Sequence, residues 1–337
     1  MKIIVDAMGG DHAPEQILKG CALAVAEYGV EILLCGKQDV IEQSAKENRI
    51  DMTGMSIVHA EQVVEMTDHA DSVVKEKKDS SMAVGMRMLK EGKGDAFISA
   101  GNTGAVITGA TLIVKRMKGV KRAAIGGLIP SMGGKKHLLI DSGANVECSA
   151  EYLHQFAIMG SMYMKCLYGM DAPRVGLLNN GTEETKGTAL QIEANALLKQ
   201  EDRICYVGNI EGRDGLLGHV DVVVTDGFSG NVYLKALEGM GKMFSKSLKG
   251  ILFKNLRTKI GALLIAKEFT EFKNSFDYTE AGGAPLLGVS GIVIKAHGSS
   301  NDVAFKNAIR QATELHRAGI IGQLSEMMMP PAKREIE

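Results

Sequence analysis

The sequence predicts an α/β fold: a doubly wound, mainly parallel sheet from which a helical hairpin protrudes. Short apolar runs alternate with longer amphipathic runs along nearly the whole chain. Several short runs are apolar at consecutive positions, as expected for strands covered on both faces. Glycine-rich loops follow most of these runs, where a parallel strand would turn into a helix. Together these observations favour strand–helix alternation over an all-helical or all-β fold.

The elements can be placed in chain order from these patterns. We expect strands at Ile3–Val5, Ile32–Cys35, Ser56–Val58, Ala96–Ser99, Ala124–Ile129, His137–Ile140, Val175–Leu178, Ile204–Val207, Val220–Val224 and Ile292–Lys295. We expect helices at Pro14–Tyr28, Ser80–Glu91, Gly104–Met117, Ala150–Tyr168, Thr188–Gln200 and Asp302–Ala318. No Pro/Ser-rich linker divides the chain, so one domain is predicted over 1–330, with a hairpin inserted at about 236–275 and a disordered tail at 331–337.

Composition excludes several classes of protein. The chain has 337 residues, 45% hydrophobic and 23% charged, with a formal net charge of −1, which gives ample core and no overall attraction to nucleic acid. Its five cysteines form no C-x-x-C pair, so no zinc or disulfide framework is expected. Only three apolar residues precede Asp6, and no apolar run approaches the roughly 18 residues of a membrane span. We expect a cytoplasmic protein that at most lies on a membrane.

Seven glycine-rich loops are the candidate sites for chemistry. They are DAMGGDHAP (6–14), SAGNTGA (99–105), DSGAN (141–145), NNGTEETKG (179–187), DGFSGN (226–231), GGAPLLG (282–288) and KAHGSSND (295–302). Six of them follow a predicted strand. Glycine lets backbone N–H groups approach an anion, and Lys186 and Lys295 add positive charge. Because ligands bind at the carboxyl ends of strands in such sheets, the loops predict an anion site.

Several familiar signatures are missing from these loops. The sequence has no P-loop, no G-x-G-x-x-G in its first strand–helix unit and no G-x-S-x-G nucleophile elbow. Asp6, Asp11 and His12 could ligate a metal, but no second cluster completes such a site; Asp11 or His12 could instead cap the helix or bond a loop. His297 could face a ligand, or be a neutral imidazole bonded to the backbone. No metal or cofactor is therefore predicted.

Taken in order, DAMGGD, SAGNTGA, GTEETKG, GFSGN, GGAPLLG and KAHGSS closely resemble the PlsX-type phosphate acyltransferases of bacterial phospholipid synthesis. The resemblance covers essentially the whole chain. It implies a fold similar to that of isopropylmalate dehydrogenase and phosphotransacetylase, and a homodimer. It also implies transfer of a long-chain acyl group from acyl carrier protein to inorganic phosphate, by direct attack of phosphate on the thioester. The product would be an acyl phosphate.

The resemblance also implies roles for individual residues. Lys186 of EETKG and Asn231 of GFSGN match the positions that the family uses for catalysis. The remaining loops would line the phosphate and thioester cleft through Asp6, Gly9, Gly10, Asp11, His12, Asn102, Thr103, Asn145, Thr182, Ser229, Gly230, His297 and Ser299. Alternative functions are a phosphotransacylase that acts on acyl-CoA, a dehydrogenase of the same fold, and a non-catalytic acyl-phosphate or lipid sensor.

Two basic stretches suggest contacts with larger partners. Residues 113–124 read IVKRMKGVKRAA, with five cations and no acid nearby in sequence, and could dock the acidic carrier protein or be a solvated helix end. From Met240 to Lys267 there are seven basic residues and no acidic one, with apolar residues at helical spacing. A dimer interface would explain the apolar face. A peripheral anchor on anionic membrane, with Ile251, Leu252 and Phe253 at its apolar tip, would explain the cations as well.

Overall fold

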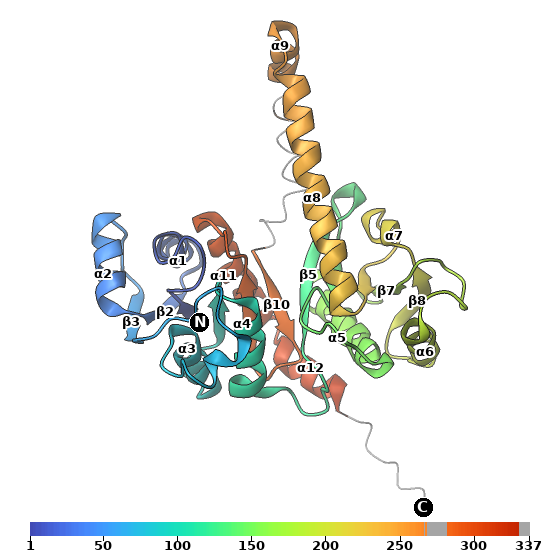
Figure 1. Cartoon of the computed structure of the whole chain (residues 1–337), viewed down its shortest axis with the longest axis horizontal. Coiled ribbons are helices and arrows are strands. Elements are labelled where there is room, and N and C mark those ends of the chain that lie inside the picture. Colours follow the sequence, from blue (N-terminus) through green and yellow to red (C-terminus); the bar gives the residue numbers. More distant parts are fainter. Residues whose placement is uncertain (266, 268–281, 330–337) are drawn as a thin grey trace, which may run out of the picture.

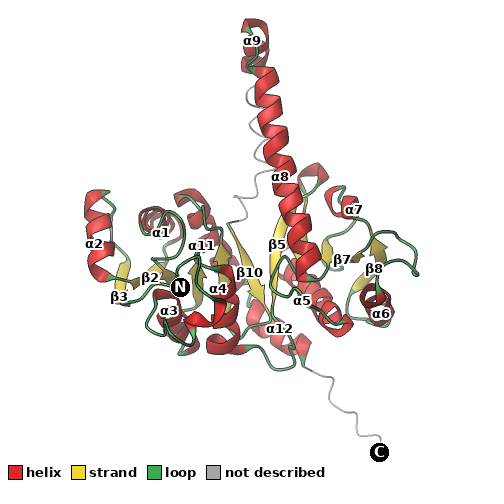
Figure 2. Ribbon diagram, viewed as in Figure 1, coloured by secondary structure: helices red, strands yellow, loops and turns green. Residues whose placement is uncertain are grey.

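The computed structural model describes residues 1–265, 267 and 282–329, which form one broad sheet with helices on both faces (Figures 1 and 2). The strand order is β3-β2-β1-β4-β11-β10-β5-β6-β9-β7-β8. In chain order the strands are β1 (Lys2–Asp6), β2 (Glu31–Gly36), β3 (Met55–His59), β4 (Ala96–Ser99), β5 (Ala124–Pro130), β6 (Lys136–Ile140), β7 (Arg174–Leu178), β8 (Cys205–Ile210), β9 (Val222–Val224), β10 (Gly283–Leu287) and β11 (Ile292–Ala296). The mainly parallel sheet predicted from the sequence is confirmed.

The two halves of the sheet run in opposite directions. Strands β3, β2, β1, β4 and β11 are parallel to one another, and so are β6, β9, β7 and β8. Between them, β10 and β5 make the three antiparallel pairings that join the halves. Neighbouring strands rotate by about 20–25° each, so the four steps from β4 to β6 turn the strand direction by about 80–100°. The carboxyl ends of the two halves therefore form two separate groups of loops rather than one edge.

The central strand β10 was missed by the sequence analysis, which treated GGAPLLG as a loop. Gly283 and Pro285 are residues that usually mark turns, which explains the error. In the structure Pro285 pairs with Ile294 of β11, and Leu286 pairs with Ile125 of β5. Leu286 and Leu287 are both buried. The segment is thus a link between the two halves and not a ligand loop.

Helices cover both faces of the sheet (Figure 2). They are α1 (Glu15–Tyr28), α2 (Gln38–Glu47), α3 (Ser81–Lys90), α4 (Thr103–Gly109), α5 (Ala150–Tyr168), α6 (Ala189–Leu198), α7 (Gly212–Leu216), α8 (Gly227–Leu252), α9 (Leu256–Leu264), α11 (Asp302–Arg317) and α12 (Ile320–Met328). Short 3-10 turns lie at Ala70–Val73 and Met132–Gly134. The single helix expected at Gly104–Met117 is instead α4 followed by a π-helical stretch, Ala110–Lys115. Helices α2, α7 and α12 were not predicted.

One face carries a continuous core and the other carries two separate cores. Alternate residues of a strand point to opposite faces, so Ile3 and Val5 join the first core while Ile4 faces the other side. The first core runs across the sheet under α1, α11, α5 and α12. On the second face, one cluster lies under α3 and α4, and a smaller one lies under α7 and the first turns of α8. On this second face, each half of the molecule therefore has its own core.

The predicted hairpin begins earlier than expected. Helix α8 starts at Gly227, where the Asp226 carboxylate accepts the N–H of Ser229 at 2.8 Å, and not near residue 236. Its glycine-rich first turn looked like a loop in the sequence. The helix ends at Leu252, and Asn255 caps α9. At about 1.5 Å per residue the 26 residues of α8 span about 39 Å, and the helix projects from the sheet (Figure 1). The rest of the predicted hairpin, and the tail from residue 330, lie outside the described residues.

The search for membrane-spanning helices found none among the residues that the structure describes. The hydrophobic residues of α8 and α9 are interrupted by polar and charged ones, and most of both helices is exposed. The exposed apolar side chains of α8 include Phe228, Val232, Met240 and Met243, which recur at helical spacing.

Close contact between α8 and the end of β6 gives a testable consequence. A Cβ added at Gly230 would lie 1.9 Å from the main-chain oxygen of Asp141. We expect Gly230→Ala to force the helix away and to lower the free energy of unfolding by about 1–3 kcal/mol. Urea denaturation followed by circular dichroism measures this change.

Gly239→Ala on the same helix is the matched control for this substitution. Nothing lies within 4 Å of a Cβ added there, so the variant should be neutral or more stable by up to about 1 kcal/mol. Equal unfolding midpoints for the two variants would show that the contact at Gly230 does not constrain α8.

Candidate active site

The first group of loops lies at the carboxyl ends of three neighbouring strands. Val5 of β1 pairs with Ile98 of β4, and Lys295 of β11 pairs with Ser99 of β4, so loops 6–14, 99–105 and 295–302 leave the sheet side by side. The N–H of Asp11 donates to the Gly298 carbonyl at 2.8 Å, which joins the first loop to the third. Three of the predicted ligand loops are thus brought together.

Asp6 is the buried centre of this first group. The Ser99 hydroxyl donates to its carboxylate at 2.7 Å, and the N–H of Met8 donates to the other oxygen at 3.2 Å. Burial raises the pKa of Asp6, and these hydrogen bonds oppose the rise. A Cβ added at Gly9 would lie 2.5 Å from the same carboxylate and 2.7 Å from the Gly101 nitrogen. The Asp6 carboxylate therefore holds loops 6–14 and 99–105 together through buried hydrogen bonds. Its contact with a ligand stays a prediction.

The exposed residues of the first loop have few partners of their own. Asp11 and His12 are both exposed, and α1 begins at Glu15 after Pro14, with no side-chain cap. The helix-capping alternative for Asp11 and His12 is therefore not seen. Gly10 has a φ of 113° and lies against Ala100 and Gly298, a conformation that favours glycine. In the described part of the chain, no group of three His, Cys, Asp or Glu side chains could hold a metal ion.

Asn102 has a structural position at the start of α4. Its side-chain oxygen accepts the N–H of Ala105 at 3.0 Å, and its amide nitrogen donates to the carbonyls of Met66 and Asp68, both at 3.0 Å. An amide nitrogen has two N–H donors, so both are used in this arrangement. Thr103 is exposed beside it. Asn102 ties the 65–68 segment to the loop, while Thr103 remains open to a ligand.

The second group of loops is built on the carboxylate of Asp141, at the end of β6. Its oxygens accept backbone N–H groups of Ile125, Gly143, Ala144 and Asn145 and the Asn145 side-chain amide, at 2.7–3.1 Å. Burial raises the pKa of Asp141, and these donors oppose the rise. The Asn145 amide also donates to the Ala123 carbonyl at 2.8 Å. Asn145, predicted to touch substrate, is used here to hold the loop.

The start of α8 presents Asn231 beside this loop. Its side-chain amide donates to the Ser142 carbonyl at 3.2 Å, and a Cβ added at Gly143 would lie 2.8 Å from the same nitrogen. Asn231 is exposed, so its second N–H donor is open to a ligand. Ser229 is half-buried and Gly230 is buried in the same turn. Asn231 thus presents one unpaired amide donor to solvent at the start of α8.

Lys186 lies in the neighbouring loop, after β7. Strands β6, β9 and β7 are adjacent and parallel, so loops 141–145, 179–187 and 226–231 leave the same edge. The Lys186 carbonyl accepts the Asn179 side-chain amide at 3.1 Å, and both Lys186 and Thr182 are exposed. The described contacts do not join Lys186 to Asn231. Their partnership in catalysis stays a prediction.

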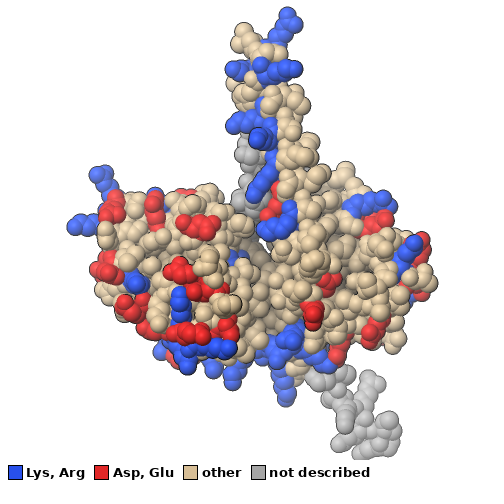
Figure 3. All heavy atoms as spheres, in the orientation of Figure 1, with Lys and Arg blue, Asp and Glu red and all other residues tan. Residues whose placement is uncertain are grey.

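Helix α8 connects the two groups of loops. One turn after Asn231, Lys235 bonds Glu238 at 2.8 Å, and both lie close enough to His297 of the first group to influence its pKa. Burial, then the charge of Lys235, lowers the pKa of His297. The N–H of Ser299 donates to His297 Nδ1 at 3.2 Å, which leaves Nε2–H as a donor in the neutral ring. Figure 3 shows Lys and Arg side chains on the projecting helices down to their base, beside a hollow between the two halves.

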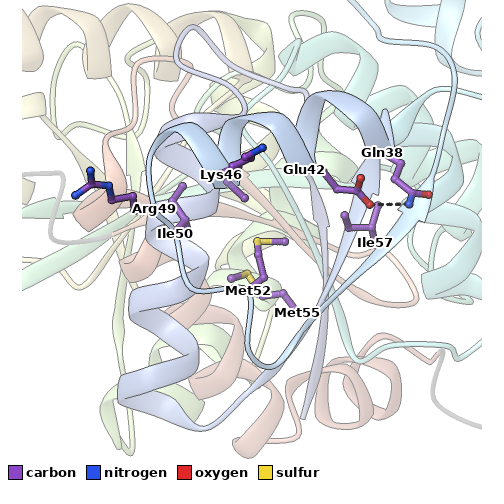
Figure 4. A pocket seen from close by; sticks show the side chains of 9 residues that line it. Gln38, Glu42, Lys46, Arg49, Ile50, Met52, Met55 and Ile57 are labelled. Carbon is purple, nitrogen blue, oxygen red and sulfur yellow. Dashed lines mark hydrogen bonds between the residues drawn. The ribbon is translucent and has the colours of Figure 1, made fainter.

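A groove at the far edge of the sheet offers no comparable chemistry. It lies between α2 and β3, where Ile50, Met52 and Met55 form an apolar floor (Figure 4). Gln38 on its rim donates to Glu42 at 2.7 Å. None of the predicted site residues lines this groove.

Sequence reasoning left three residues out of the predicted site. Asp141 was part of a recognised loop, but its role as the acceptor for five donors depends on distant backbone. Lys295 was noted for its charge and not assigned a position. Lys235 lies in an ordinary helical stretch and gives no signal of its own. The positions of these three residues near the two loop groups can be recognised only from the tertiary structure.

The comparisons with known proteins agree with this arrangement. A family model described as "Fatty acid synthesis protein" matches residues 1–323. A phosphate acyltransferase of Acetivibrio thermocellus is 47% identical over 338 residues, covering 100% of this chain and 99% of the relative. One from Clostridium botulinum is 45% identical, covering 96% of both chains. The chain belongs to the PlsX-type phosphate acyltransferase family. The resemblance stated from the motifs is thereby confirmed.

A solved structure gives independent support for the fold. The phosphotransacetylase from Streptococcus pyogenes aligns with a TM-score of 0.62 at 16% identity, covering 94% of each chain. At this identity the likeness concerns the fold alone. It confirms the expected relation between PlsX-type phosphate acyltransferases and phosphotransacetylases in architecture.

The proposed catalytic residues can be tested directly. We expect Lys186→Ala and Asn231→Ala each to lower turnover by about 10²–10³, the usual cost of losing a donor to a developing oxyanion. Acyl-phosphate formation at saturating phosphate measures the loss.

Lys199→Ala is a suitable control, because Lys199 is an exposed lysine of the same half, paired with Glu184. It should keep the rate of the unmodified protein. More than about a tenth of that rate in either test variant would remove the residue from the catalytic step.

Proposed function

We propose that the protein transfers a long-chain fatty acyl group from acyl carrier protein to inorganic phosphate, and that the acyl phosphate feeds phospholipid synthesis. The observation that carries this proposal is the family match along residues 1–323, together with relatives named phosphate acyltransferase. The two glycine-rich loop groups, connected by α8, suit a reaction in which an anion must be held beside a thioester.

The proposed reaction needs few groups from the protein. A phosphate oxygen attacks the thioester carbonyl carbon, a C–O bond forms, and the tetrahedral intermediate then expels the thiolate as the C–S bond breaks. A thiol has a pKa near ~8.5, so the thiolate leaves with little acid assistance and takes a proton from water. Lys186 would hold the phosphate through its charge, and the open N–H of Asn231 would stabilise the oxyanion. Because thioester and acyl phosphate are both activated, no nucleotide is consumed.

Carrier protein would dock on the basic stretch that borders the second loop group. Residues 116–123 precede β5, and the Ala123 carbonyl accepts the Asn145 amide, so this stretch adjoins the site. No acid lies near these cations in the sequence, but the fold brings Glu151 of α5 into an ion pair with Lys121. Arg122 lies over the Tyr152 ring, 5.6 Å from its centre. Lys118 and Arg122 are therefore better candidates than Lys121 for contacting an acidic partner.

An assay with two donors tests the function and the docking surface together. We expect phosphate-dependent thiol release from palmitoyl carrier protein, with formation of acyl phosphate. Lys118→Glu with Arg122→Glu should raise the KM for carrier protein at low salt by about 10-fold and leave the KM for palmitoyl-CoA unchanged, because CoA lacks the acidic protein surface.

The alternatives predict other outcomes of this assay. Higher activity with palmitoyl-CoA than with carrier protein would favour an acyl-CoA phosphotransacylase. Binding of acyl phosphate without turnover of either donor would favour a sensor. Lys90→Glu, at the exposed end of α3, supplies a charge-reversed control that should change neither KM.

We also propose that α8 and α9 mediate a homodimer and a peripheral contact with anionic membrane. Along α8, Phe228, Val232, Met240 and Met243 recur at helical spacing and are 55–62% exposed. Near the tip, Ile251 and Phe253 are 62% and 54% exposed, while Leu252 is half-buried. A second copy would cover the stripe along α8. A membrane surface would accept the tip and the surrounding cations, each worth about 1 kcal/mol near anionic lipid.

Vesicle binding separates these two contacts. We expect the protein to sediment with vesicles of phosphatidylglycerol and phosphatidylcholine, and Leu252→Glu with Phe253→Glu to release it while activity in solution persists. Val232→Glu on the lower stripe is the comparison variant: it should weaken the dimer in analytical ultracentrifugation and leave the tip intact. Unchanged sedimentation of the double variant would leave the tip without a membrane role.

A further inference from the structure

Lys186 lies in a loop whose side chains are almost all open to solvent. Every residue from Thr182 to Ala189 is exposed. Within the described part of the chain, Lys186 takes part in no ion pair, whereas Glu184 of the same loop is paired with Lys199. An exposed polar loop has many conformations of similar free energy, so a side chain that must meet a substrate in one geometry needs its backbone to be held.

Hydrogen bonds hold the backbone of this loop. The Lys186 N–H donates to the Glu183 carbonyl at 3.1 Å, and the Lys186 carbonyl accepts the side-chain amide of Asn179 at 3.1 Å. The Glu183 carbonyl also accepts the side-chain amide of Asn209 at 2.9 Å. Asn209 belongs to β8 and is only 7% exposed. It therefore ties the exposed turn that carries Lys186 to the buried edge of the sheet.

A β-bulge in β8 determines the face on which Asn209 lies. The pairing of β8 with β7 shifts by one residue between Tyr206 and Gly208, so Val207 has no partner on β7. Gly208 has a φ of 101°, a conformation that favours glycine. Because side chains alternate between the two faces of a sheet, one extra residue exchanges the faces of those that follow. The bulge thus places Asn209 where its amide reaches the Glu183 carbonyl.

Stability alone does not explain an asparagine at position 209. Its side-chain oxygen is buried and has no hydrogen-bond partner among the described residues. A buried acceptor without a partner raises the free energy of the folded state. The Glu183 carbonyl would still accept the Lys186 N–H if the asparagine were absent. What the Asn209 amide adds is therefore a fixed position for the turn.

We propose that Asn209 is a positioning residue for Lys186. Its amide N–H acts through the Glu183 carbonyl and holds residues 183–186 in the conformation in which the lysine meets phosphate. The proposal rests on the proposed function, in which Lys186 holds the attacking phosphate, and Asn209 itself touches no substrate. A turn that is ordered in advance loses less entropy when phosphate binds, and it keeps the ammonium in line with the reacting atoms.

Steady-state kinetics of Asn209→Leu tests this role. Leucine has the branched shape of asparagine but no N–H donor. We expect the kcat/KM for phosphate to fall about 10- to 100-fold, as for a misplaced catalytic group, while the KM for the acyl donor stays the same. An unchanged kcat/KM for phosphate would overturn the proposal. Thermal denaturation checks that the variant is folded, and Asn209→Ala, which also lacks the donor, replaces it if leucine does not fit.

A double-mutant cycle shows whether Asn209 acts through Lys186. In a Lys186→Ala background, Asn209→Leu should lower turnover by less than about 2-fold, because the group that it positions is already absent. Equal losses in both backgrounds would show an independent structural effect of Asn209 and would contradict a positioning role.

Asn195→Leu is the matched control. Asn195 lies on α6 in the same half, is 5% exposed, and accepts the Tyr206 hydroxyl at 2.7 Å through its side-chain oxygen. The substitution removes a buried hydrogen bond that has no connection to the Lys186 loop, so kcat/KM should stay within about 2-fold. A loss as large as that of Asn209→Leu would mean that any buried hydrogen bond in this half has the same effect, and the specific role would be lost.

Proteolysis gives a measurement that does not depend on turnover. Endoproteinase Lys-C cleaves after lysine, and its rate at a folded loop follows the fraction of molecules in which the loop is open. In the full chain without substrate, we expect Asn209→Leu to speed cleavage after Lys186 about 10-fold, as for loss of one hydrogen bond, and Asn195→Leu to leave it unchanged. Mass spectrometry of the fragments identifies this cleavage among those at other lysines.

The proposed function and the positioning role fail in different ways. If the unmodified protein turns over no acyl donor but Asn209→Leu speeds cleavage after Lys186, the proposed function is wrong and Asn209 still holds the loop. If turnover is normal and Asn209→Leu changes neither the cleavage rate nor kcat/KM, the positioning role is wrong and the function stands.

Discussion

The carboxylate of Asp141 is the constraint on which the geometry of the site depends. It accepts donors from β5, from its own loop and from the Asn145 side chain, at 2.7–3.1 Å. The main-chain oxygen of the same residue leaves room only for a glycine at position 230 of α8. The loop therefore fixes where α8 begins and in which direction it leaves the sheet. Asn231, Lys235 and Glu238 follow within two turns, so their positions relative to His297 depend on this one contact.

The arrangement of the sheet explains why a helix such as α8 is needed to connect the two groups of loops. In a fully parallel sheet all carboxyl-end loops meet at one edge, and a ligand site needs no further connection. Here β10 and β5 reverse the direction of one half, and the accumulated twist turns it further. The loops after β1, β4 and β11 are separated from those after β6, β7 and β9. A long helix that starts in the second group carries Lys235 and Glu238 close enough to His297 of the first group to influence its pKa.

Local pattern was sufficient for most of the fold. Strands such as β1 and β9 are consecutive apolar residues buried on both faces, and that signal is visible in the sequence. Helix α2 has only Ile41 and Ala45 buried, too few for a clear period, and it was missed. β10 was missed because its Gly and Pro residues are turn signals, and only its pairing with β11 and β5 makes it a strand. Strand direction depends on such distant pairings and cannot be derived from local pattern.

The candidate site was predictable as a set of loops, but the use of each polar side chain was not. Asn102, Asn145 and Asn231 all follow glycine-rich motifs and look alike in sequence. In the structure Asn102 donates its amide N–H groups to main-chain carbonyls, and Asn145 donates to the Ala123 carbonyl and to the Asp141 carboxylate, while Asn231 keeps one N–H open. Lys186 and Lys295 are likewise both lysines in glycine-rich loops. One is exposed, and the other is half-buried with a lowered pKa. These differences arise from tertiary neighbours, which a single sequence does not contain.

Helix α8 physically connects the candidate site, at its first turn, with the exposed tip at its last turn. Asn231 lies in its first turn and Leu252 is its last residue, about 32 Å away at 1.5 Å per residue. Because a capped, continuous helix is stiff, the proposed contact at the exposed tip would fix the direction in which Asn231 faces at the other end. An acyl phosphate pairs a long apolar chain with a charged head, so it is released most easily where apolar and aqueous phases meet. A tip that holds the protein at such a boundary would therefore also set where the product leaves, without any movement inside the sheet.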